Sequence, residues 1–296
     1  MNRPVLALMG SSLLWGCAWM PLKALGQAGL DGLVLVLCTF SLLTLATLPM
    51  AWKHSGGASA AGPLLLIALL GGGANLAFTL AMVYGEVVRS MALFYLLPLW
   101  GVLGGRLILG EPIDGLRWLG VALALCGAWL ILGGVDILHT LPSGFELFGL
   151  LAGFLLAMNN LVFRGVAQLP LSPKLAAMFA GCAALAGLGL IGTDQSWPTN
   201  IAPLAWGGVL LYAFVWLLPA NLGAQYGVTH LEAGRASVIL ILELVAAVVS
   251  ATLIGDEWMT PLEWTGAGLI LSAALIEALR SESRSTPDPV TRSDAL

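Results

Sequence analysis

The sequence predicts an all-α integral membrane protein, with ten transmembrane helices built as two inverted five-helix repeats around a central cavity. Of its 296 residues, 59% are hydrophobic and only 9% are charged, against about 25% in an ordinary soluble domain. Ten apolar runs can each cross a bilayer, and the second half of the chain echoes the first. Because folding cannot hide so much apolar surface from water, this composition excludes a soluble enzyme, a nucleic-acid-binding protein and a disordered chain.

The ten runs are predicted to be helices because each is about 20 residues long, enough to cross about 30 Å of hydrocarbon. Polar or turn-prone segments separate them, such as Lys53–Gly57 and Asp194–Pro198. The connections are too short to hold an extramembrane domain. The expected spans are 4–24, 31–52, 63–84, 88–109, 115–135, 146–164, 174–193, 203–227, 235–255 and 260–279.

The distribution of Lys and Arg predicts the orientation in a bacterial inner (plasma) membrane. Ten of the 12 basic residues fall in the N-terminus, the loops after even-numbered spans, and the tail. Lys23 and Arg89 alone fall on the opposite side. Cytoplasmic segments carry the excess of basic residues, so both termini are expected in the cytoplasm. Residues 280–296 are polar and repetitive, which predicts a disordered cytoplasmic tail.

A shift of 146 residues places 86–133 on 232–279 without a gap, and 13 of the 48 positions match. The informative pairs are Glu86/Glu232, Arg89/Arg235, Glu111/Glu257, Trp118/Trp264 and Gly120/Gly266. Residues 1–140 and 141–279 are therefore expected to be two five-helix repeats. An odd number of spans per repeat inverts the second one, and inverted repeats are typical of secondary transporters with a site near mid-membrane.

This architecture resembles the drug/metabolite transporter superfamily with its paired EamA domains. The resemblance lies in the stretch Ala92–Leu99, in Gly110-Glu111-Pro112 and in Trp118-Leu119-Gly120. Within the superfamily, the Tyr-x-x-Pro of the fourth span and the many deep aromatic residues are most similar to YddG-type exporters. That resemblance implies export of aromatic and other neutral amino acids. The second half departs from the pattern, with Asp256-Glu257-Trp258 in place of Gly-Glu-Pro and Leu244 in place of the proline.

Glu243 is the sharpest single signal for a functional site. It lies near the middle of the ninth expected span, where an ionisable residue costs a few kcal/mol to insert. It is expected to face a wet cavity, a partner, or both. It could bind a substrate ammonium, take up a proton during the cycle, or form a structural hydrogen bond between helices.

Four asparagines pose a similar question within the spans: Asn75, Asn159, Asn160 and Asn221. An amide at that depth needs partners, so each is expected either to line the cavity or to join two helices. Together with Glu243 they could present a polar pocket.

Deep aromatic residues complete the predicted substrate-binding cavity. Trp15 and Trp19 are four residues apart and are expected to share one face of the first span, as are Tyr212 and Trp216 in the eighth. Tyr95 lies deep in the fourth span. Such rings either pack the core or wall a ligand pocket for aromatic side chains or organic cations.

Prolines interrupt three of the spans at Pro21, Pro98 and Pro219. Each removes a backbone donor and favours a kink, which is either static or a hinge for gating.

Other classes of protein fit the sequence less well. The spans contain no Asp pair, no H-E-x-x-H and no G-x-S-x-G, so an intramembrane enzyme is not expected. No ring of charges indicates a channel filter. The four cysteines lie apart in apolar runs, so neither a disulfide framework nor a metal site is expected, and no cofactor is implied. We expect a monomeric exporter of amino acids in contact with membrane lipid. Other small metabolites, drugs or organic cations are the alternative substrates.

Overall fold

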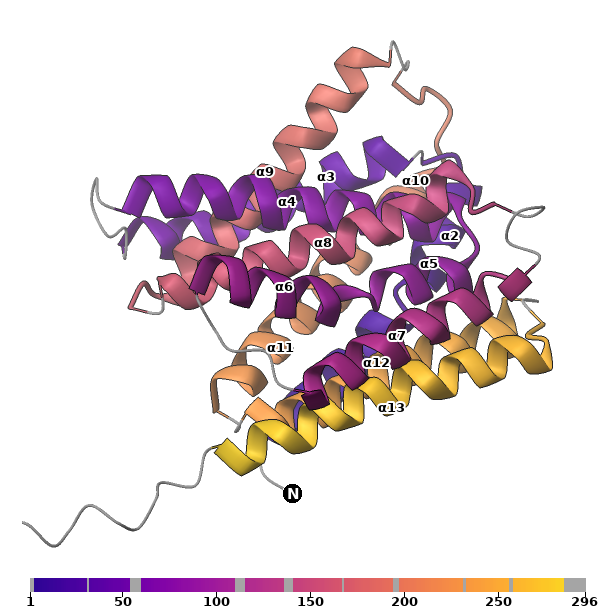
Figure 1. Ribbon diagram of the computed structural model, residues 1–296. Helices are drawn as coiled ribbons and strands as arrows, with labels where there is room; N and C mark the ends of the chain where they lie inside the picture. Colours follow the sequence, from indigo (N-terminus) through magenta and orange to yellow (C-terminus); the bar gives the residue numbers. More distant parts are fainter. Residues whose placement is uncertain are drawn as a thin grey trace, which may run out of the picture.

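The computed structural model describes residues 3–30, 32–53, 60–109, 115–135, 141–166, 168–193, 197–230, 233–255 and 258–284. Regular structure within these ranges is helical, and each expected span coincides with a helix or a broken helix (Figure 1). The elements are α1 Arg3–Gly16, α2 Trp19–Gln27, α3 Gly32–Lys53, α4 Ala61–Tyr84, α5 Val87–Phe94, α6 Leu97–Leu109, α7 Gly115–Ile131, α8 Gly144–Gly165, α9 Leu171–Gly192, α10 Pro203–Leu211, the π-helix η3 Tyr212–Leu217, α11 Leu218–His230, α12 Ala233–Ile254 and α13 Pro261–Arg284.

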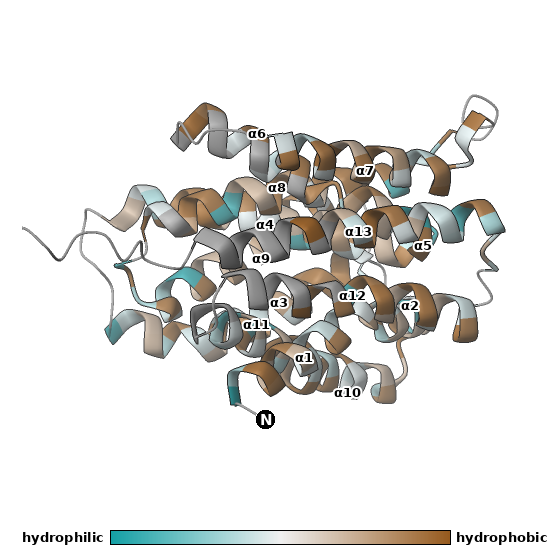
Figure 2. Ribbon diagram, turned by 60° about the horizontal axis from the view of Figure 1, so that its bottom comes forward, coloured by the Kyte–Doolittle hydropathy of each residue, from teal (hydrophilic) through white to brown (hydrophobic). Residues whose placement is uncertain are grey.

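The chain is a multi-pass membrane protein by the length and composition of its helices. Among the described residues, six helical segments are long and apolar enough to cross a bilayer: Arg3–Gln27, Gly32–Lys53, Ala61–Tyr84, Gly144–Phe163, Leu171–Gly192 and Pro203–Gly227. Shorter apolar helices lie in α5–α6, α7 and α12. Figure 2 shows hydrophobic residues along most of each helix. Large apolar side chains such as Leu107 and Leu204 are more than four-fifths exposed, as side chains that face lipid would be.

Glycines allow the helices of the bundle to approach closely. Gly72 of α4 lies against the backbone of α9 at Gly181 and Cys182, where there is no room for a Cβ atom. Gly149 and Gly153 of α8 likewise lie against the Ser90 and Phe94 carbonyls of α5. Small residues at such contacts maximise packing where lipid removes the hydrophobic driving force. Gly101 of α6, by contrast, faces open space.

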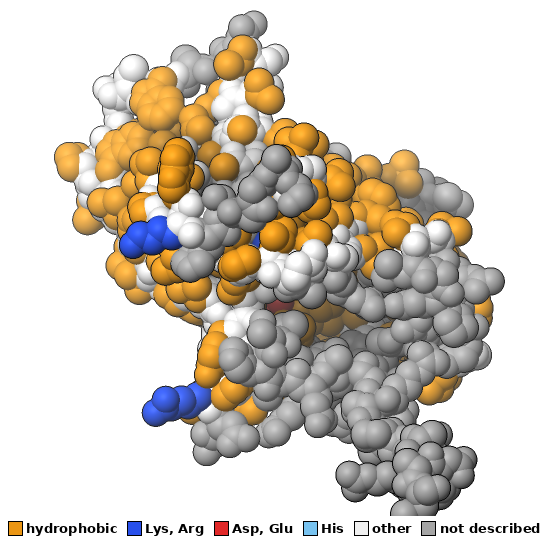
Figure 3. Space-filling view, turned by 90° about the vertical axis from the view of Figure 1, so that its left-hand side faces the viewer, with side chains coloured by type: hydrophobic (Ala, Val, Ile, Leu, Met, Phe, Trp, Pro, Cys, Tyr) orange, Lys and Arg blue, Asp and Glu red, His pale blue; other side chains and the backbone are white. Residues whose placement is uncertain are grey.

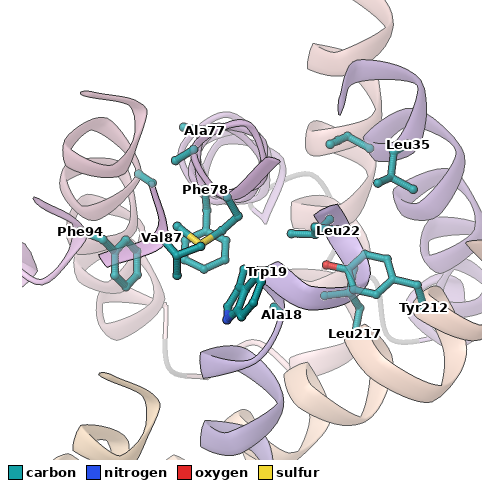
Figure 4. Packing of buried hydrophobic residues seen from close by; sticks show 14 of the residues in the cluster. Ala18, Trp19, Leu22, Leu35, Ala77, Phe78, Val87, Phe94, Tyr212 and Leu217 are labelled. Atoms are coloured by element: carbon teal, nitrogen blue, oxygen red, sulfur yellow. The ribbon is translucent and has the colours of Figure 1, made fainter. Parts of the chain in front are cut away.

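Segments from the two halves of the chain pack against each other throughout the bundle. The first helix, α1, packs on α11 and α12, whereas α8 packs on α4, α5 and α6. The helices α7 and α13 lie side by side along the lower edge of Figure 1, with Gly127 against Gly266. The buried core therefore draws on both halves, and Figure 4 shows part of it, with Leu22 and Phe78 of the first half in the same cluster as Leu217 of the second.

The C-terminal helix α13 is longer than expected. It remains helical to Arg284, five residues into the segment for which a disordered tail is expected. Arg and Glu in this stretch have good helix propensity, and extending an existing helix avoids the cost of nucleation. Residues 285–296 lie outside the described residues.

Candidate functional site

Tyr95 lies at the break between α5 and α6, inside the fourth expected span. Pro98 has no N–H to donate to the Phe94 carbonyl four residues earlier, so α5 ends at Phe94. Tyr95 N still donates to Met91 O at 2.9 Å, and α6 begins at Leu97. The break coincides with the proline that the sequence marks as a candidate hinge.

The Tyr95 hydroxyl donates a hydrogen bond to the Glu243 carboxylate of α12. This bond joins the first half of the chain to the second. Gly16 of α1 lies against the Glu243 backbone, and a Cβ atom at Gly16 would overlap α12. Both side chains are partly buried. The carboxylate thus has the partner that an ionisable group in a span requires.

A row of aromatic rings leads away from this pair. The ring of Phe94 lies 5.5 Å from that of Tyr95, Phe78 lies 5.3 Å from Phe94, and Trp15 lies 5.8 Å from Phe78. All three contacts are edge-to-face, the arrangement that ring quadrupoles favour. We call Trp15, Phe78, Phe94, Tyr95 and Glu243 the central cluster. It is built from α1, α4, α12 and the break after α5.

The first span is broken between α1 and α2, and Trp15 and Trp19 lie on either side of the break. The Ala18 N–H donates to Trp15 O at 3.1 Å, one residue short of the usual Leu14 acceptor. The freed Leu14 carbonyl accepts instead from Trp216 Nε1 at 2.7 Å. Pro21 explains the break, because its ring clashes with the carbonyl four residues earlier.

Tyr212 and Trp216 lie in the π-helix η3, directly before Pro219. A π-helix bonds residues five apart, so residues four apart are stacked less directly than in an α-helix. Tyr212 is only 4% exposed and packs in the core near Leu217 (Figure 4). Trp216 is partly buried and contacts α1, so the two rings have different environments.

Among the described residues, no asparagine side chain contacts the Glu243 carboxylate. Asn75 Nδ2 donates to Gly71 O at 2.8 Å and Asn221 Nδ2 to Leu217 O at 2.8 Å, both within their own helices. Asn159 is 3% exposed, and its Oδ1 points at Gly71 of α4 without a hydrogen-bond partner among the described residues. Asn75 and Asn159 therefore approach the same turn of α4.

Trp19 does not take part in the hydrogen bond between Tyr95 and Glu243. It is 5% exposed, and its Nε1 donates to Ser250 Oγ of α12 at 2.9 Å. Sequence reasoning missed Ser250, Phe78 and Phe94. A signal was available for each: Ser250 follows Glu243 by seven residues and shares its face of α12, Phe94 precedes Tyr95, and Phe78 is one turn from Asn75.

A second polar group lies where α5 begins. Arg89 Nη2 donates to Leu132 O at 3.1 Å, and its guanidinium lies 3.7 Å from Glu146 and 3.9 Å from Glu86. Glu146 is 4% exposed and also completes a capping box with Ser143 at the start of α8. The group ties α5, α7 and α8 together at one end of the bundle.

The opposite end carries Lys and Arg side chains and is hollowed. Figure 3 shows this end, with an acidic side chain and hydrophobic side chains visible in the depth of the hollow.

Comparison with known proteins finds similarity to transporters. Residues 2–133 match the EamA-like transporter family. Over 161 residues the chain is 30% identical to an uncharacterized transporter of Vibrio cholerae serotype O1, covering 51% of this chain and 53% of the relative. The chain thus matches about half the length of that relative.

A solved crystal structure shares the fold over 96% of this chain and 99% of its own, with a TM-score of 0.64 and 17% sequence identity. At that identity the likeness concerns the fold alone. Residues 2–133, slightly less than half of the chain, are thus similar to the EamA-like transporter family.

Proposed function

We propose that this protein is a secondary transporter that exports amino acids, aromatic and other neutral ones, across the bacterial inner membrane by alternating access. The central cluster carries the proposal. It combines one carboxylate at mid-span, a tyrosine hydroxyl from the other half of the chain, and three further aromatic rings.

The chemistry of the cluster suits an amino acid. Glu243 offers a negative charge to a substrate ammonium, and desolvation strengthens that attraction. The row from Trp15 to Tyr95 offers apolar faces and edges to a substrate side chain. Trp216, Asn75 and Asn159 are further candidates to line the path, whereas Tyr212, Asn221 and Trp19 are better suited to packing. The substrate ammonium would displace the Tyr95 hydroxyl or share the carboxylate with it.

Packing between the halves supports the inverted repeat and hence alternating access. The 146-residue shift carries α5–α6 onto α12 and α7 onto α13. Correspondingly, α1 packs on α12 while α8 packs on α5 and α6, and α7 pairs with α13. The same shift relates the contact of Gly127 with Gly266 to that of Gly120 with Ala273. Two similar packings in one chain let inward-open and outward-open states lie close in energy.

The direction of opening follows from charge. The hollowed end in Figure 3 carries Lys and Arg, which marks it as cytoplasmic by the positive-inside rule. The described conformation is then open inward. Pro21, Pro98 and Pro219 are the proposed hinges, because a helix break or a π-helix lies within one turn before each of them. Ten spans would enclose the path in a monomer.

A second candidate substrate class is organic cations, including cationic drugs. No residue of the central cluster is cationic, so a substrate carboxylate finds no ion partner there. A carboxylate beside aromatic faces would bind a quaternary ammonium by charge and cation–π attraction.

Efflux from proteoliposomes tests the proposal. Vesicles loaded with radiolabelled tryptophan are followed with and without a pH gradient, and unlabelled amino acids or a quaternary ammonium compete in a panel. We expect saturable efflux that neutral amino acids inhibit. Inhibition by the quaternary ammonium alone would assign the second class, and leakage independent of substrate would reject a transporter.

A further inference from the structure

The short helix α2 is separated from α1 by a two-residue turn. It follows the turn at Cys17 and Ala18, and Met20 N donates to Cys17 O at 3.1 Å in place of the N–H that Pro21 lacks. Breaks at prolines are where helices bend, so α2 can tilt while α1 stays packed. By the charge distribution, α2 forms the outer half of the first span.

Trp19, the first residue of α2, bonds across to the second half of the chain. Its Nε1 donates a hydrogen bond to Ser250 Oγ at 2.9 Å, and Ser250 Oγ in turn donates a hydrogen bond to Ala247 O at 3.1 Å. The side chains are 5% and 8% exposed, so the bond is shielded from solvent. The indole also lies against Gly255, where a Cβ atom would come 2.9 Å from the ring. Figure 4 shows Trp19 among buried core side chains, beside Ala18.

The Trp19–Ser250 bond lies between Glu243 and the outer end of α12. Seven residues separate Ser250 from Glu243, which is two helical turns or about 10 Å along one face. Gly16 of α1 touches that same face at Glu243 and Ala247. The indole therefore closes the seam between the two halves just outside the central cluster.

Beyond the indole lies a pocket of about 370 Å³, between α2 and the end of α4. Lys23, Gln27, Val83 and Tyr84 line it. The Lys23 ammonium lies 5.6 Å from the centre of the Trp19 ring, so the ring is close to the pocket as well as to α12. The pocket is large enough for an amino acid and has a cationic group at its wall.

We propose that Trp19 and Ser250 form a latch on the outer end of the transport path, and that the pocket between α2 and α4 receives the released substrate. The inference rests on the transport function proposed above. When the bond breaks, α2 tilts away from α12 and connects Glu243 to the pocket. There the Lys23 ammonium meets the carboxylate of the departing amino acid, a group that the central cluster does not bind.

Cysteine accessibility tests the latch without any substrate, so its result stands apart from the identity of the exported compound. In a background with the four native cysteines replaced, Ala247→Cys reports on the space between Ser250 and Glu243. Ser250→Ala removes the acceptor and Trp19→Phe the donor. A buried neutral hydrogen bond contributes about 1 kcal/mol, so each variant is expected to raise labelling by an outside, impermeant thiol reagent about fivefold.

The two changes act on one bond, so the double variant should label no faster than either single variant. Matched controls are Trp52→Phe, an exposed tryptophan, and Ser272→Ala, an exposed serine that bonds its own helix. Neither should change labelling. The unfolding midpoint of each variant distinguishes an opened latch from a misfolded chain. Unchanged outside labelling in well-folded Ser250→Ala, or additive effects in the double variant, would overturn the latch.

Lys23→Gln tests the pocket. This variant should slow tryptophan release and leave labelling at Ala247→Cys unaltered. Unaltered release would overturn the pocket's role.

Discussion

At the scale of single residues, the side chains of the central cluster differ in how replaceable they are. Trp15, Phe78 and Phe94 contribute apolar surface and ring edges, which another large aromatic residue supplies in part. Glu243 and Tyr95 contribute a specific hydrogen bond between the two halves of the chain. Predictions at this scale therefore concern these two polar groups.

Replacing Glu243 with glutamine keeps its shape and removes its charge. We expect tryptophan efflux to fall about tenfold or more, because hydrogen bonds to a charged group contribute about 1.5–3 kcal/mol. Remaining efflux should lose any dependence on pH between about 5 and 8 that the parent protein has. Glu263→Gln is the matched control, because glutamine also completes the capping box with Thr260. Efflux equal to the parent at every pH would remove Glu243 from the mechanism.

Replacing Tyr95 with phenylalanine keeps the ring in the aromatic row and deletes the hydroxyl. The carboxylate then loses its donor, so we expect the KM for tryptophan to change about threefold to tenfold while the unfolding midpoint changes little. Concentration dependence of efflux measures the first and thermal unfolding the second. Tyr226→Phe, on the exposed face of α11, serves as the control. A KM identical to the parent would mean that the Tyr95–Glu243 bond does not contribute to substrate binding.

At the scale of elements, backbone contacts at glycine and breaks at proline organise the helices. Gly149 and Gly153 lie one turn apart on α8 and meet carbonyls one turn apart on α5. The Gly-x-x-x-Gly motif is visible in the sequence, but Gly101, which belongs to a motif with the same spacing, has no neighbouring helix beside its Cα atom. The pattern alone thus does not identify which glycine faces a partner helix.

Gly153→Leu should destabilise the protein, because its side chain would overlap the Phe94 carbonyl and push α8 away from α5. Overpacking of this kind lowers the free energy of unfolding by about 1–3 kcal/mol. We expect a loss near the top of this range, because the obstructing atoms belong to the α5 backbone and cannot move aside as a side chain can. Thermal unfolding in detergent measures the loss. Gly101→Leu, which enters open space, should leave the midpoint nearly unchanged. Equal midpoints for the two variants would refute the close α5–α8 contact.

Pro219→Ala should restore a donor to the middle of the eighth span and favour a regular α-helix over η3. Because proline costs about 3 kcal/mol in a helix interior, we expect higher stability. If the break serves gating, efflux should become slower even though the protein is more stable. Pro203→Ala, at the first turn of α10 where proline is tolerated, is the control for both measurements. Faster or unchanged efflux would assign the break a static role.

At the scale of the whole molecule, the two halves contribute to one core and one polar site, so their relative orientation decides the function. The tie from Arg89 to Glu146 and the latch at Trp19 lie at one end, whereas the hollow lies at the other. The alternating access proposed above predicts this arrangement for an inward-open state.

Single cysteines in a cysteine-free background test the topology. Leu141→Cys, before α8, should react with an impermeant reagent added outside intact cells. Lys53→Cys, at the end of α3, should react only after permeabilisation, because basic segments remain cytoplasmic. The opposite pattern, or equal reactivity of both, would reject the proposed orientation.

Much of the fold was predictable from the sequence, because local chemistry determines it. The apolar runs located the helices, and the three prolines located the breaks near residues 17, 95 and 212. That Glu243 and Tyr95 each need a polar partner was also predictable, since a buried polar group requires one, but not that they bond to each other. These inferences need no knowledge of which helices are neighbours.

Only the tertiary structure decided which faces meet. In a lipid-embedded helix almost every face is apolar, so periodicity carries little information about partners. The break after Gly16 sends Trp15 toward Phe78 and Trp19 toward Ser250, although their spacing suggests one shared face. Asn75 and Asn221 return their hydrogen bonds to their own helices. The sequence by itself determined what lies at mid-membrane depth, and packing at small residues determined what each group touches.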